Sequence, residues 1–175
     1  MAGIHTQQVD MHQAKQPVSA ALTGPYGHPF HPILVTIPIG AWVTSLVFDI
    51  GSHVVDDPAY LNRGATWLLA VGVLGALAAA SVGFLDLLSI PSGTKAFRTG
   101  LTHMSLMLLV TVAFALNFWW RTASRSQGAV DAGPLALTVV SLIVLTVAGA
   151  LGGKLAYRYG VRVVDEATQA DGFTR

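Results

Sequence analysis

Two histidines, His28 and His31, open the first long apolar stretch of the chain, in the sequence Gly27-His-Pro-Phe-His-Pro32. Proline is tolerated at the first position of a helix because its missing N–H would have no partner there, so Pro32 predicts a helix beginning at this point. His31 is therefore expected at or just before a helix N-terminus. Imidazoles at the mouth of an apolar helix are suited to binding a metal ion or haem iron.

Two more groups are expected at the same depth, since Asp86 lies near the end of the second apolar segment and His103 near the start of the third. Three imidazoles and a carboxylate suit zinc, copper or non-haem iron, which gives a predicted metal set of His28, His31, Asp86 and His103. Two imidazoles on different helices can instead hold haem iron from both faces, with His31 and His103 as the leading pair. Haem b is the expected cofactor, and copper or zinc is the alternative.

Other interpretations of this cluster remain open. A histidine near a membrane interface is often only a hydrogen-bonded polar group, and Asp86 is also placed to neutralise Lys154 or Arg158. Met104 and Met107 add thioethers that ligate copper or haem, although apolar packing explains them more simply. The same residues therefore also fit a structural polar cluster without a cofactor.

A second polar layer is expected on the opposite side of the bundle. Asp49 and His53 are four residues apart and share a helix face, so they could form a carboxylate–histidine pair that orients a ligand or relays a proton. An interfacial hydrogen bond at the helix end is the simpler alternative. From His31 to His53 the chain spans 22 residues, or roughly 33 Å of helix, so the two layers cannot share one site.

Composition identifies the chain as an integral membrane protein. It is 53% hydrophobic and only 11% charged, with a mean hydropathy of +0.58, against about 25% charged residues in soluble domains. The absence of cysteine excludes disulfides, thiolate-bound zinc and iron–sulfur clusters. A net charge of +1 without a basic patch does not suggest nucleic acid. No hydrolase, kinase or transferase motif is present, so the chain is at most a redox subunit.

These residues must be positioned by four apolar segments, expected at about 32–54, 66–90, 101–120 and 134–157. Each is long enough for a hydrocarbon core that takes about 20 helical residues. Short links make consecutive segments antiparallel, which predicts an all-α, up-down transmembrane four-helix bundle over residues 27–160. Residues 1–26 are expected to be a polar tail and residues 161–175 a C-terminal cytoplasmic tail. No internal repeat is evident.

Cationic residues are more frequent on the side that holds both termini. This excess predicts cytoplasmic termini in a bacterial inner membrane, by the positive-inside rule. The cations on that side are Lys15, Lys95, Arg98, Lys154, Arg158 and Arg162, and those opposite are Arg63, Arg121 and Arg125.

The sequence resembles the bacterial membrane family called domain of unknown function 2231 over roughly residues 25–165. The resemblance rests on the His28-Pro29-Phe30-His31-Pro32 opening, on Asp49, Gly83, Asp86 and His103, and on the closing Gly152-Gly153-Lys154 with Gly160-Val161. It implies a four-helix membrane module, and relatives joined to Rieske-type or c-type cytochrome domains imply electron transfer by association. The chain departs from its relatives at Tyr159, where many of them carry a histidine.

The sequence thus predicts a membrane protein with a histidine-rich intramembrane site, binding haem or a metal ion and serving electron transfer. The expected partners are the lipid bilayer and a respiratory or other redox protein, and a homo-oligomer is left open. The alternative is a non-redox transport or assembly subunit with a structural polar cluster.

Overall fold

Four apolar helical spans make up the bundle in the computed structural model, which describes residues 2–124 and 127–174. The first span, Phe30–Gly51, is divided at Val35 into α2 (Phe30–Leu34) and α3 (Thr36–Gly51). The others are α4 (Ala59–Leu88), α5 (Lys95–Ser124) and α6 (Ala132–Tyr157). All four are long and apolar enough to cross a membrane, so the predicted all-α transmembrane bundle is confirmed.

Helices α4 and α5 are longer than the sequence segments indicated. Each has 30 residues, or about 45 Å of helix, whereas a hydrocarbon core is about 30 Å thick. The extra turns carry polar residues, such as Asn62 near the start of α4 and Arg121 near the end of α5. Hydropathy falls there, although the backbone remains helical.

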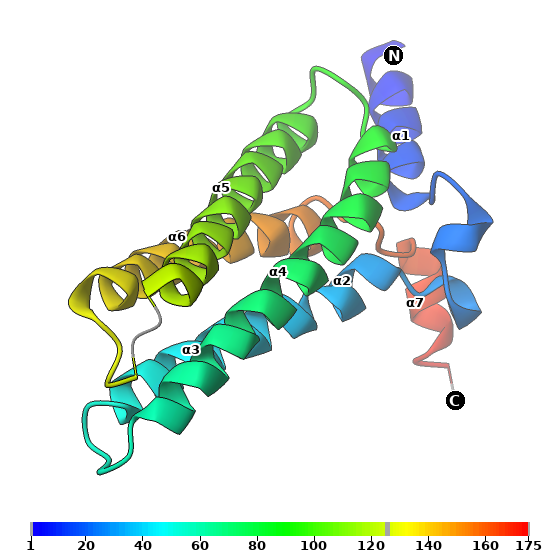
Figure 1. Ribbon diagram of the computed structural model, residues 1–175. Helices are drawn as coiled ribbons and strands as arrows, with labels where there is room; N and C mark the ends of the chain where they lie inside the picture. The colour runs from blue at the N-terminus through cyan, green and yellow to red at the C-terminus, as the bar shows by residue number, and fades with distance from the viewer. Residues whose placement is uncertain (1, 125–126, 175) are drawn as a thin grey trace.

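The helices pair as two hairpins, α3 with α4 and α5 with α6 (Figure 1). Their up-down order places the start of α2, the α4–α5 loop and the end of α6 at one end of the bundle, here called the termini end because both chain ends lie there. The other end carries the α3–α4 and α5–α6 loops and is called the loop end. Arg125, one of the cations assigned to that end, lies outside the described residues.

An apolar cluster fills the middle of the bundle. Trp42, with no exposed surface, stacks on Phe114 with ring centroids 4.3 Å apart. Leu69, Ala76, Val110 and Leu145 complete this cluster. Many large apolar side chains point outward instead, as expected where lipid replaces water.

The polar tails also fold. Residues Ala2–Lys15 form helix α1, two short 3₁₀ turns follow at Ala20–Leu22 and Pro25–Gly27, and α7 spans Glu166–Asp171. The tails meet, since the backbone N–H of Arg162 donates to the Ala14 carbonyl at 3.1 Å and the Lys15 ammonium lies 3.7 Å from the Glu166 carboxylate. The N-terminal segment expected to be a tail is therefore a helix held against the C-terminal segment.

Candidate functional site

His31 is the second residue of α2 and reaches across to α4. Its Nδ1 atom lies 2.9 Å from the carbonyl oxygen of Ala79. The ring also packs against Gly83, where an added Cβ would lie 2.8 Å from Cε1 of the imidazole. Only glycine leaves room for the ring at that position of α4.

His103 occupies the matching position in the second hairpin. It stands on α5, and its Nδ1 atom lies 2.7 Å from the carbonyl oxygen of Ala148 on α6. One turn further along α6, a Cβ added at Gly152 would lie 3.1 Å from Cε1 of the ring. Each imidazole is thus held by one carbonyl and one glycine of its partner helix.

The two imidazoles are neighbours, with ring centroids 6.5 Å apart and planes at 89°. A carbonyl oxygen only accepts hydrogen bonds, so each Nδ1 must carry the proton and donate it. The lone pair of each neutral ring is therefore on Nε2, which has no hydrogen-bond partner within the described ranges. This is the tautomer in which a histidine ligates a metal while its other nitrogen holds the ring in place.

The other predicted ligands are arranged differently. Asp86 is buried, and its carboxylate lies 2.9 Å from Nε of Arg162, so its cationic neighbour is neither Lys154 nor Arg158. His28 is half-buried at the turn before α2, with its ring edge-on to Tyr26. Over the part of the chain that the structure describes, no three His, Cys, Asp or Glu side chains gather closely enough to hold a metal ion. Among the predicted ligands, His31 and His103 are the pair whose rings meet.

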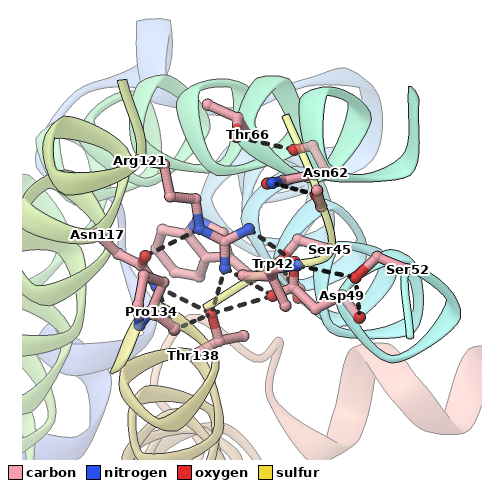
Figure 2. A network of polar contacts seen from close by, with 12 residues as sticks. Trp42, Ser45, Asp49, Ser52, Asn62, Thr66, Asn117, Arg121, Pro134 and Thr138 are labelled. Atoms are coloured by element: carbon pink, nitrogen blue, oxygen red, sulfur yellow. Dashed lines mark hydrogen bonds and ion pairs between the residues drawn. The ribbon is translucent and has the colours of Figure 1, made fainter. Parts of the chain in front are cut away.

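A second polar network lies toward the loop end, centred on a buried ion pair (Figure 2). Arg121 donates from Nη1 and Nη2 to the two carboxylate oxygens of Asp49, at 2.6 and 2.7 Å. Its Nε donates to Asn117 at 3.0 Å, and Nη2 also donates to Thr138 at 3.2 Å. This network joins α3, α5 and α6, and Asp49 and Asn117 have no exposed surface.

The sequence located Asp49 but missed Arg121, its partner. The predicted segment ends at residue 120 and so places Arg121 in a loop, whereas the residue is 6% exposed and helical. The available signal was its spacing, since Asn117 lies four residues earlier and therefore on the same helix face. His53, the partner expected for Asp49, is exposed beyond the end of α3.

The first span and α5 carry the same three-layer pattern. On each, a histidine is followed after eleven residues by an aromatic residue and after seven more by a charged residue, with an offset of 72 residues between the two sets. Members of a set meet their counterparts in the bundle. The contacting pairs are His31 with His103, Trp42 with Phe114, and Asp49 with Arg121.

Helices α4 and α6 repeat as well, with an offset of 69 residues. Ala79 and Ala148 accept from the two histidines, and Gly83 and Gly152 support the two rings. The chain is therefore two repeated hairpins that run in the same direction and face each other across an approximate two-fold axis along the bundle. Residues 31–49 and 103–121 share only three identical positions out of 19, which is why no repeat was evident from the sequence.

Comparison with known proteins gives one match. A family described as predicted membrane protein, DUF2231, matches residues 27–165, which is most of the chain and includes both hairpins. None of the curated proteins and none of the solved structures compared with the chain matches it.

Proposed function

The chain belongs to the DUF2231 family of predicted membrane proteins, and we propose that it is an electron-transfer protein that binds haem b between His31 and His103. The observation that carries this proposal is the imidazole pair itself. Two rings from different hairpins lie 6.5 Å apart between centroids, and both are fixed as the tautomer with a free Nε2.

The number of ligands favours haem over a bare metal ion. A zinc site takes three or four protein ligands, and the described residues offer no group of three. Haem iron receives its equatorial nitrogens from the porphyrin and needs only axial ligands from the protein. The predicted copper or zinc site with His28 and Asp86 is therefore the second choice.

The surrounding residues suit this role. The carbonyl groups of Ala79 and Ala148 hold the two rings in orientation, and Gly83 and Gly152 give them space. When bound, a haem with two imidazole ligands supplies one-electron redox chemistry with no open position for substrate.

The loop end of the bundle argues against transport through its interior. The Trp42–Phe114 stack fills the middle of the bundle, and the Asp49–Arg121 ion pair follows about two helical turns closer to the loop end. A cavity beside Arg121 measures about 10 Å³, which is no more than a single water needs. A substrate following this route would have to break a buried ion pair.

Absorption spectroscopy of the protein purified from its native membrane tests the proposal. We expect a Soret band and, after reduction with dithionite, a sharp α band. Both should be lost in His31→Ala and in His103→Ala and kept in the control His53→Ala, whose side chain is exposed at the loop end. Protein that stays colourless and metal-free after titration with haemin would overturn the proposal and leave a non-redox subunit. Colourless protein with stoichiometric copper or zinc would replace haem with a bare metal.

We also propose a bacterial cytoplasmic membrane, cytoplasmic termini and a respiratory or other redox protein as partner. The cationic excess at the termini end supports the orientation. Because the chain has no cysteine, single cysteines placed at Val18 and Asp56 report the side of each end. An impermeant maleimide added to spheroplasts should label the Asp56 position and spare the Val18 position, and the reverse pattern would invert the orientation.

A further inference from the structure

Arg162 is buried against Asp86 at the termini end, although it lies beyond the last span. Its side chain is 7% exposed, and its Nε lies 2.9 Å from the Asp86 carboxylate. Its backbone φ is +59°, which is uncommon for a residue other than glycine, and its N–H donates to the Ala14 carbonyl. Contacts from two directions therefore hold this arginine inside the termini end.

The guanidinium group is not satisfied by the residues that the structure describes. Its Nη2 atom is buried without a hydrogen-bond partner, and its contact with Asp86 does not have the geometry of a hydrogen bond. Buried donors without acceptors are rare in folded proteins because each carries an unrecovered desolvation cost. An unused N–H donor on a buried cation indicates an anionic group that residues 2–124 and 127–174 do not supply.

This arginine belongs to the same level of the bundle as the two histidines. Asp86 follows Gly83, the support of His31, by three residues, and its carboxylate lies within electrostatic range of the His31 imidazole. The repeat does not duplicate this feature, since Leu155 occupies the position of α6 that corresponds to Asp86. The imidazole pair is nearly symmetric, whereas the cation stands on one side of it.

We propose that Arg162 is the anion anchor of the haem site, donating from Nη2 to a propionate carboxylate of the bound haem. The inference rests on the proposed function and adds the residue that would hold a carboxylate of the cofactor. A planar guanidinium matches a carboxylate with charge-assisted hydrogen bonds. Asp86 then positions the guanidinium from its other side.

Titration of apoprotein with two forms of the cofactor tests the anchor. Haemin carries free propionates, whereas haemin dimethyl ester has the same ring and iron with both carboxylates blocked. We expect the wild-type protein to bind haemin roughly 10- to 100-fold more tightly than the ester, as for one charge-assisted hydrogen bond. Arg162→Gln should abolish that preference by weakening haemin binding alone.

The ester also serves as the folding control, because Arg162→Gln should bind it with wild-type affinity and a wild-type bis-imidazole spectrum. The matched control is Arg158→Gln, which removes an exposed cation one turn earlier and should keep the preference. Equal binding of both forms by the wild type, or an unchanged preference in Arg162→Gln, would overturn the anchor while the haem proposal stands. A phospholipid phosphate as the true occupant would appear as a preference present in neutral detergent and lost when anionic lipid is added. Failure of the wild type to bind either form would overturn both proposals.

Discussion

The Asp49–Arg121 ion pair gives the sharpest test of how the bundle is held together. We consider three variants: Asp49→Leu, Arg121→Met and the double variant that carries both. Each single change leaves one charge buried without its partner. The double change removes both charges and leaves apolar side chains of similar length.

The contacts set the expected sizes. Breaking a buried ion pair by removing one partner costs about 3–5 kcal/mol, because the remaining charge stays desolvated. Arg121 also donates to Asn117, so the double variant leaves one buried amide oxygen without a donor, which costs about 1–3 kcal/mol. The double variant should therefore be more stable than either single variant, although simple addition would make it the least stable.

Thermal unfolding in detergent, followed by circular dichroism at 222 nm, measures this ordering. A domain of 150–250 residues loses roughly 2–4 °C of Tm per kcal/mol, so each single variant should fall by about 6–20 °C and the double variant by about 2–12 °C. Spectra and elution volume at low temperature show whether each variant folds before heating.

Additive losses would contradict the reasoning. A double variant that melts at the sum of the two single shifts would mean that Asp49 and Arg121 act independently, so that the contact between them contributes nothing. A shift below about 2 °C in Arg121→Met would mean that other groups solvate the remaining Asp49 carboxylate.

Three further predictions follow from the packing and the tails. Gly83→Ala should weaken haemin binding at least tenfold, because its methyl group would lie 2.8 Å from Cε1 of the His31 imidazole. The control Gly149→Ala, whose methyl group would meet nothing within 4 Å, should leave the haemin titration unchanged. Trp42→Ala should lower the Tm by about 6–20 °C, from a cavity cost of about 3–5 kcal/mol, and Trp67→Ala, at a 73% exposed side chain, should leave the Tm within 2 °C. Asp165 caps α7 by accepting a hydrogen bond from a backbone N–H, and this bond lowers the pKa of its carboxyl group. The cap is therefore complete above the ordinary pKa of an aspartate and is lost as the pH falls through the lowered pKa. Hydrogen exchange at the capped amide should therefore gain protection only above that range, and protection that is the same at pH 2 and pH 7 would contradict the cap.

The sequence was sufficient for the bundle and for the imidazole pair. Apolar length fixes the number of spans, and up-down threading then carries His31 and His103 to the same level. It was insufficient for the two arginines. A cation at or beyond the end of an apolar segment looks like a loop charge. Whether it lies inside depends on the rotation of the helix at Arg121 and on the path of the turn after α6 at Arg162.

The repeat is hard to see in the amino-acid sequence for a related reason. A lipid-facing position accepts any apolar side chain, so most positions of the two halves are free to diverge. What persists is the identity of a few inward-facing residues and their spacing. The repeat is therefore visible in the spacing of polar and aromatic residues and not in overall residue identity.

Because the two hairpins share one pattern, each could in principle pair with a copy of itself. The charges at the loop end disfavour that pairing. If the first hairpin met a second copy of itself, two carboxylates would be forced together in an apolar interior, and two copies of the second hairpin would bring two guanidinium groups into contact. Only the mixed combination places opposite charges face to face. Asp49 and Arg121 thus favour the pairing of a first hairpin with a second hairpin, and they disfavour the pairing of two identical hairpins from neighbouring molecules in the membrane.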